Sequence, residues 1–315
     1  MDRSQAHMPT FSAEIPLARP NRESLVRQRR RFVLLMLTPA TLLLLVLTLY
    51  PFLASFWYSL TDYSLLEPND RDFIGLGNYA SLLRGGEFWW SLRVTTLFCV
   101  MAVGVETLLA LGIALLLQAE TGAGWLRAVY MIPMAITPVA ATFTFRLMYS
   151  PSLGVINYAL ERLGLPPQAW LADPTMALPA LVLVDVWQWT PFILLIVVGG
   201  LSVIPSEPLE AAALDGASGW RLFRDVTFPY LRPFLAIAVL FRFIDAFKTF
   251  DIIYVLTGGG PGTATRTLNL FAFKQGIEFL EMGYAASIAI LMLVVVTIAS
   301  RLFVRMTRLL EPGEG

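Results

Sequence analysis

The segment SEPLEAAALDGASGWRLFRDVTFPYLRP, residues 206–233, lies between two long apolar segments and determines how the rest of the chain is interpreted. Ser206 is positioned to cap a short helix, and Gly216 to end it, because glycine tolerates the left-handed backbone that often follows a helix. Ser218 is positioned to cap a second short helix, and Pro229 opens the next apolar run. We therefore predict a small helical elbow at a membrane surface, for which an ordinary amphipathic loop helix is the alternative interpretation.

The spacing inside this elbow resembles the EAA signature of the permeases of binding-protein-dependent ABC importers. Residues 210–212 read Glu-Ala-Ala, Gly216 follows after three residues, and residues 226–229 read Val-Thr-Phe-Pro after nine more. The family pattern ends in Ile-x-Leu-Pro, and here Val226 and Phe228 replace the isoleucine and the leucine. In that family the elbow is a coupling helix that docks on a cytoplasmic ATPase, and the resemblance implies the same role here. The resemblance assigns the ATPase contact to Glu210, Ala211, Ala212, Asp215 and Gly216.

The composition indicates a polytopic membrane protein. Of 315 residues, 57% are hydrophobic and only 15% are charged, which excludes a soluble globular domain of ordinary composition. The formal net charge is zero and the basic residues do not form one patch, so nothing indicates a nucleic-acid partner. The single cysteine, Cys99, cannot form an internal disulfide, and a single histidine, His7, excludes a His/Cys metal site. No cofactor is implied.

Long apolar segments predict an all-α protein that crosses the bilayer six times. A hydrocarbon core of about 30 Å requires roughly 20 helical residues. The segments that meet this length are residues 32–60, 94–118, 126–149, 177–203, 229–256 and 283–304. The resemblance implies that these helices form the type I permease fold of ABC importers. We expect a flexible cytoplasmic tail over residues 1–31, a permease domain over 32–308 that contains the coupling loop 206–229, and a C-terminal tail over 309–315.

The distribution of Lys and Arg predicts the orientation of the chain. An even number of spans places both termini on one side of the membrane. Fourteen basic residues then lie on the side of the termini, seven lie on the opposite side, and two lie inside the fifth span. Because basic residues are enriched in cytoplasmic loops, both termini and the elbow are predicted to be cytoplasmic. The resemblance to ABC importer permeases implies that this membrane is a bacterial-type inner, or plasma, membrane.

Charged residues inside two of the predicted spans mark a candidate site. Asp185 lies in the span at 177–203, and Arg242, Asp245, Lys248 and Asp251 follow one another at three-residue intervals in the fifth span. Ionisable groups at membrane depth are costly, so they usually pair with one another or line a pathway. One interpretation is therefore a substrate pathway. The other is a set of internal ion pairs, Arg242 with Asp245 and Lys248 with Asp251, that hold helices together.

Alignment with maltose-type permeases, through the elbow and the glycine-rich turn at residues 258–262, adds site residues by resemblance. The positions that face the sugar in those permeases fall here on Gln188, Trp189, Phe192, Arg242, Asp245, Ala246 and Thr249. The family's wall is rich in asparagine, whereas this one is not. Its residue types still suit a sugar, since an aromatic ring stacks on a pyranose and carboxylate, guanidinium and amide groups bond to hydroxyls.

The sequence lacks a means of using ATP. A phosphate-binding loop requires Gly-Lys-Ser/Thr, but both lysines, Lys248 and Lys274, follow phenylalanine. The chain is therefore predicted not to be an enzyme, with ATP hydrolysis on separate subunits.

The resemblance implies a permease subunit that passes a sugar, such as the disaccharides trehalose or maltose, from an extracytoplasmic binding protein into the cytoplasm. A second permease and two ATPases are the expected partners in the bilayer. The alternatives are a permease for glycerol-phosphate or another oligosaccharide, and a proton-coupled secondary sugar carrier that uses Asp245 and Lys248 as a relay.

Overall fold

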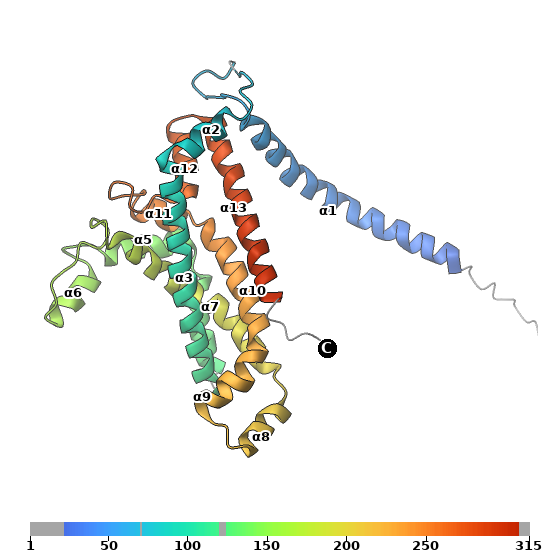
Figure 1. Ribbon diagram of the computed structural model, residues 1–315, viewed down its shortest axis with the longest axis vertical. Coiled ribbons are helices and arrows are strands. Elements are labelled where there is room, and N and C mark those ends of the chain that lie inside the picture. Colours follow the sequence, from blue (N-terminus) through green and yellow to red (C-terminus); the bar gives the residue numbers. More distant parts are fainter. Residues whose placement is uncertain (1–21, 70, 120–123, 309–315) are drawn as a thin grey trace, which may run out of the picture. The chain divides into compact units, whose positions relative to one another are not determined.

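Helices joined by turns and loops make up the part of the chain that the structure describes. This computed structural model describes residues 22–69, 71–119 and 124–308, and Figure 1 shows their helices. These residues contain no β-strand, and their one isolated bridge joins Thr61 to Phe73. The chain divides into two compact units, residues 1–54 and 55–315. The prediction of an all-α protein is confirmed.

Helix α1 (Arg22–Tyr58) supplies all the described residues of the first unit. Its apolar stretch Arg29–Tyr58 is long enough to cross a membrane, and none of its most apolar window is buried. An apolar helix that is exposed in this way requires lipid or another protein around it. The helix begins ten residues before the predicted span, so residues 22–31 are helical. The other parts of the two predicted tails, residues 1–21 and 309–315, lie outside the described residues.

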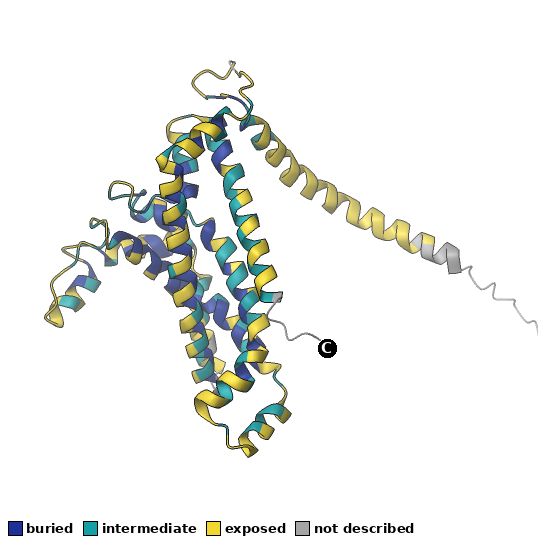
Figure 2. Ribbon diagram, in the orientation of Figure 1, coloured by how far each residue is buried: buried dark blue, intermediate teal, exposed yellow. Residues whose placement is uncertain are grey.

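Three helices form the core of the second unit. These are α3 (Gly86–Ala119), α7 (Ala177–Ser202) and α10 (Phe228–Phe247), each of which packs against the other two. Helix α13 (Met282–Arg308) packs on α10. Figure 2 shows that buried residues lie on the faces these helices turn toward one another, while their outer faces are exposed. This pattern is expected for a bundle whose outer surface contacts lipid.

Two of the predicted spans are interrupted. The third consists of α4 (Gly124–Ala135) and α5 (Pro138–Met148), which are bent by 91° relative to each other. Pro138 explains the break, because proline has no N–H to donate and disfavours the helical conformation of the residue before it. The fifth consists of α10 and the short helix α11 (Asp251–Leu256), which packs against α5.

These breaks affect the number of membrane crossings. Four described helices are long and apolar enough to cross, namely α1, α3, α7 and α13, and a fifth crossing is obtained if α4 and α5 are counted together. Helix α10 has 20 residues, but it carries charged residues and stops before α11. Each predicted span therefore corresponds to helical segments, while length and composition do not confirm the count of six.

Short helices lie at the two ends of the bundle, as Figure 1 shows. At one end are α8 (Ser206–Leu214), α9 (Gly219–Leu222) and the π-helical turn Phe223–Thr227. At the other end are α2 (Gly77–Arg84), α12 (Leu268–Phe273) and the π-helical turn Lys274–Glu278. Helix α6 (Val155–Arg162) lies in the loop between α5 and α7. The elbow predicted from residues 206–233 is thus a distinct helical end of the bundle.

Helices α7 and α10 approach each other closely at Gly200. A Cβ atom built on Gly200 would lie 2.8 Å from Cγ of Phe234 and 3.1 Å from a methyl group of Leu231. The neighbouring Gly199 has nothing within 4 Å of the same position. Only Gly200 is therefore required by the packing of these two helices.

We expect Gly200→Ala to destabilise the protein by about 1–3 kcal/mol, the usual cost of overpacking a core. Gly199→Ala is the matched control and should be neutral or slightly stabilising, because alanine favours a helix over glycine. Thermal unfolding of both purified variants in the same detergent measures the difference. Equal melting temperatures for the two variants would show that α7 and α10 do not pack at this distance.

Candidate functional site

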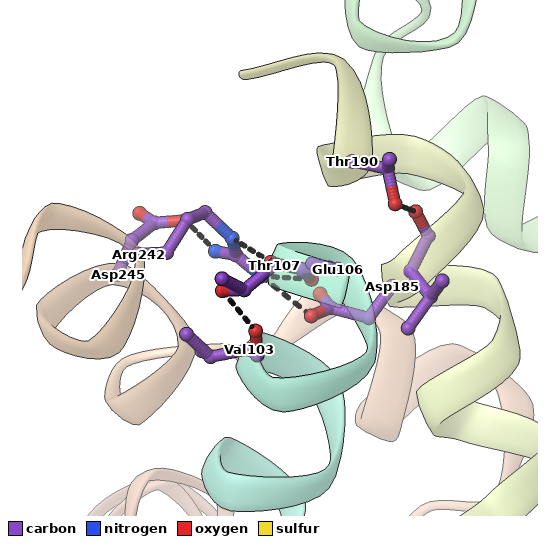
Figure 3. A network of polar contacts seen from close by, with 8 residues as sticks. Val103, Glu106, Thr107, Asp185, Thr190, Arg242 and Asp245 are labelled. Atoms are coloured by element: carbon purple, nitrogen blue, oxygen red, sulfur yellow. Dashed lines mark hydrogen bonds and ion pairs between the residues drawn. The ribbon is translucent and has the colours of Figure 1, made fainter. Parts of the chain in front are cut away.

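A buried ion cluster joins the three core helices. Arg242 on α10 binds both oxygens of Glu106 on α3, with Nε and Nη2 each 2.8 Å from the carboxylate. Its Nη2 also donates to Asp185 of α7 at 2.6 Å, and its Nη1 donates to Asp245 at 2.8 Å. Figure 3 shows these carboxylates converging on the one guanidinium group. The cluster therefore ties α3, α7 and α10 together at a single point.

Small residues allow the helices to meet at the cluster. Alanine stands four residues before and four residues after both Glu106 and Arg242, so each charged side chain has an alanine one turn above and below it on the same face. Each of these alanines is almost fully buried: Ala102, Ala110, Ala238 and Ala246. Alanine side chains let backbones approach closely, which brings the charged groups within hydrogen-bond distance. The sequence thus encodes both the charges and the space for them.

The guanidinium group of Arg242 has little capacity left for a ligand. Four hydrogen bonds to carboxylates occupy four of its five N–H donors. The ring of Trp189 covers its face, with the ring centre 5.2 Å from Cζ, and the side chain is only 1% exposed. Arg242 therefore serves the protein itself.

Two other predicted site residues are also buried. Gln188 on α7 donates from Nε2 to the carbonyl oxygen of Ile136 at 2.9 Å, which lies at the break between α4 and α5. The break frees that carbonyl, and the glutamine side chain replaces its helical partner. Ala246 is 2% exposed and belongs to the apolar core. In this structure these two residues, like Arg242, support the backbone and the core.

The remaining predicted site residues keep accessible surface. The side chain of Asp245 is 49% exposed, although one of its oxygens binds Arg242. Trp189, Phe192 and Thr249 are partly buried. The structure brings Trp189 and Asp245 together through their shared contact with Arg242. These accessible residues are the ones from which a substrate contact can be built.

Of the two ion pairs that the sequence predicts together, the first is confirmed and the second, Lys248 with Asp251, is wrong. Arg242 and Asp245 are paired, whereas Lys248 and Asp251, both described, form no ion pair. Instead, the carbonyl oxygen of Lys248 accepts a hydrogen bond from Nδ2 of Asn269 at 2.6 Å. A free backbone carbonyl at the end of α10 thereby gains a hydrogen-bond donor from a side chain of α12.

The sequence analysis missed Glu106, which makes the bidentate contact with Arg242. A signal was present, because Glu106 is the only charged residue in the apolar segment 94–118. An ionisable residue inside a membrane span marks a functional or pairing site in its own right. Its partner could not be deduced, since Arg242 is 136 residues away.

Gly216 ends the first helix of the elbow, α8, as predicted. Gly216 has a φ of 76°, and its N–H donates to the carbonyl oxygen of Ala213 at 3.0 Å. The N–H of Ala217 donates to Ala212 at 2.9 Å, which completes the two bonds of a Schellman cap. The predicted start is wrong by one residue, because Pro205 occupies the N-cap and Ser206 is the first helical residue. Helix α9 begins after Ser218 as predicted, though without a side-chain cap.

The elbow presents its signature residues on the surface. Of the predicted coupling residues, Ala212 is partly buried and four are exposed: Glu210, Ala211, Asp215 and Gly216. Helices α8 and α9 contain no buried residue. Leu214 is 90% exposed and Trp220 is 71% exposed, and apolar side chains this accessible are typical of a contact surface for another protein.

The sequence comparison decides the family. Residues 93–312 match the binding-protein-dependent transport system inner membrane component family. The match covers most of the chain, including the elbow and the ion cluster. The chain belongs to this family. It is therefore a multi-pass membrane protein and the permease component of an ABC sugar importer, and it is not itself an enzyme.

Two relatives are similar to the permease over most of their length. The trehalose/maltose transport system permease protein MalF of Thermococcus litoralis is 42% identical over 263 residues, which cover 83% of this chain and 88% of the relative. The sulfoquinovosyl glycerol transport system permease protein SmoG of Agrobacterium fabrum is 33% identical over 280 residues, which cover 89% and 91%. The two names specify different sugars, so the family alone does not identify the cargo.

A solved structure supports the fold. The permease resembles a chain of a bacterial alginate ABC transporter in complex with a periplasmic protein that binds alginate pentasaccharide, with a TM-score of 0.77. The sequences are 20% identical, and the match covers 92% of this chain and 99% of the other. The predicted ABC importer permease fold is thereby confirmed.

We expect Arg242→Met to destabilise the permease by about 3–5 kcal/mol, because it leaves Glu106 and Asp185 buried without their cation. The matched control is Arg224→Met, since Arg224 is exposed and pairs only with the exposed Asp225. The loss of monodisperse protein on heating in detergent should occur at a lower temperature for the first variant and be unchanged for the second. Equal heat resistance would mean that the cluster does not hold the helices.

Proposed function

We propose that this permease pairs with a second permease subunit and two ATPases, and that it passes a disaccharide such as trehalose or maltose from an extracytoplasmic binding protein into the cytoplasm. The observation that carries the choice of sugar is the 42% identity with a trehalose/maltose permease. This identity exceeds the 33% shared with the permease for sulfoquinovosyl glycerol. The proposed orientation places both termini and the elbow in the cytoplasm.

The accessible residues of the candidate site support a sugar as cargo. Trp189 offers an aromatic ring for the apolar face of a pyranose, and the half-exposed carboxylate of Asp245 offers acceptors for hydroxyl groups. Phe192 and Thr249 extend the proposed wall on the same two spans. The proposed wall contacts are few, which suits a site that must release its cargo.

The elbow supports the proposed coupling to an ATPase. Its exposed signature residues and its exposed leucine and tryptophan form a surface that no other described residue covers. Rings of Trp220, Phe223 and Phe228 lie in series, with centres 5.3 and 5.7 Å apart, and lead from α9 into α10. A push on the elbow would therefore reach the helix that carries Arg242 and Asp245.

The decisive experiment reconstitutes the permease with its partner subunits and binding protein in lipid vesicles. Uptake of trehalose or maltose that requires ATP and is blocked by orthovanadate supports the proposal. Uptake of sulfoquinovosyl glycerol or glycerol-phosphate instead would replace the proposed cargo while keeping the transporter class. Uptake that is abolished by an uncoupler and unaffected by vanadate would indicate the proton-coupled carrier.

We expect Asp245→Asn to lower the uptake efficiency about tenfold or more, because a hydrogen bond to a charged group contributes about 1.5–3 kcal/mol. Asp251→Asn makes the same change six residues along the chain, outside the proposed wall, and is the control. Initial rates at several sugar concentrations, with copurification of the ATPase as a check on assembly, measure the effect. If both variants transport like the unaltered protein, Asp245 does not contact the sugar.

We expect Gly216→Val to abolish sugar-stimulated ATP hydrolysis, because a β-branched residue at a φ of 76° cannot keep the helix end. Gly216→Asn is the control, since asparagine tolerates this backbone conformation and should retain most of the stimulation. Both variants should insert into the membrane normally. Full stimulation of the valine variant would show that the geometry of this cap is not needed for coupling.

A further inference from the structure

The ion cluster carries more negative than positive charge. One guanidinium group faces three carboxyl groups, those of Glu106, Asp185 and Asp245, all within 2.8 Å of its nitrogens. With every group ionised, the four sum to two negative charges. If Glu106 and Asp185 hold one proton between them, the sum is still one negative charge. The sign of the cluster is therefore the same in either state.

The only cation in the cluster is withdrawn from the surface. Glu106 and Asp185 are fully buried and hold the Nε and Nη2 side of Arg242, while Trp189 covers its face. The accessible group of the cluster is the carboxylate of Asp245. Charges in a buried, low-dielectric setting act over longer distances than charges in water. A solute beside Asp245 therefore meets the net negative charge of the cluster and no free guanidinium group.

We infer that Glu106 and Asp185 are positioning residues that set the charge selectivity of the permease. By occupying Arg242, they keep the wall beside Asp245 negative, so that it accepts neutral sugars and disfavours phosphorylated, sulfonated or carboxylated ones. This inference rests on the proposed function in one respect, namely that Asp245 faces the cargo.

The charge of the wall can be measured without knowing the cargo. Cys99 is the single cysteine of the chain and is fully buried, so a thiol introduced at Thr249 is the one that reagents reach. Thr249 follows Asp245 by four residues and is partly exposed. Thr249→Cys is reacted with a cationic and with an anionic methanethiosulfonate, and each rate is divided by the rate of the same reagent with a free thiol in solution. The charge ratio is the corrected rate for the cationic reagent divided by that for the anionic one. The assembled transporter is used in lipid nanodiscs, and the label is measured on the permease chain alone after the subunits are separated.

We expect the cationic reagent to be favoured by about tenfold at this position. Asp185→Asn and Glu106→Gln, each combined with Thr249→Cys, should lower the ratio toward one, because each removes a carboxylate and loosens the hold on Arg242. Asp225→Asn makes the same chemical change in the elbow and should leave the ratio unaltered. Lys248 and Asp251 lie on either side of Thr249 and carry opposite charges, so they offset each other in Thr249→Cys alone, and they are the same in every variant that is compared with it.

A ratio of one or less in Thr249→Cys alone would overturn the inference, even if the other variants fail to assemble. An unchanged ratio in both Asp185→Asn and Glu106→Gln would also overturn it, because the two residues would then have only a structural role. If the unaltered transporter takes up neither trehalose nor maltose while the ratio in Thr249→Cys is above one, only the proposed sugar is rejected. Disaccharide uptake with a ratio of one or less would reject the charge selectivity alone.

Discussion

The burial of one guanidinium group in an apolar bundle is the constraint on which the rest of this structure depends. An ionised group cannot remain unpaired in such a place, so Arg242 must have carboxylates within reach. They come from three positions: Glu106 on α3, Asp185 on α7 and Asp245 on α10 itself. A buried ion pair adds little net stability over a well-packed apolar contact, but breaking one is costly. The cluster therefore specifies which helices are neighbours and at what height they meet.

The same constraint governs the breaks in the helices. A backbone carbonyl or N–H group exposed by a break cannot be left without a partner inside a membrane. Gln188 supplies a donor to Ile136 at the break between α4 and α5, and Asn269 supplies one to Lys248 at the end of α10. Polar side chains in these spans thus have two possible uses. Their presence in the sequence alone does not show which use applies.

Local features could be predicted from the sequence, and long-range ones could not. Gly216 ends α8 because the required backbone conformation depends on a few adjacent residues, and Arg242 pairs with Asp245 because they are three residues apart on one helix. The contact between Glu106 and Arg242 spans 136 residues, so it depends on how helices pack. The same limitation explains Gln188, whose type suits a sugar ligand although its side chain bonds to another helix.

In the proposed mechanism, α10 connects the energy source to the cargo. The elbow leads into α10 through a π-helical turn, and α10 carries Arg242 and Asp245 in about its last one and a half turns, at the end away from the elbow. A displacement of α10 alone would break the contacts with Glu106 and Asp185, which costs several kcal/mol, whereas movement of α3, α7 and α10 together leaves the cluster intact. The rigid body in the proposed cycle is therefore this set of three helices. The breaks between α4 and α5, at residues 136–137, and between α10 and α11, at residues 248–250, are then the places where the bundle changes shape.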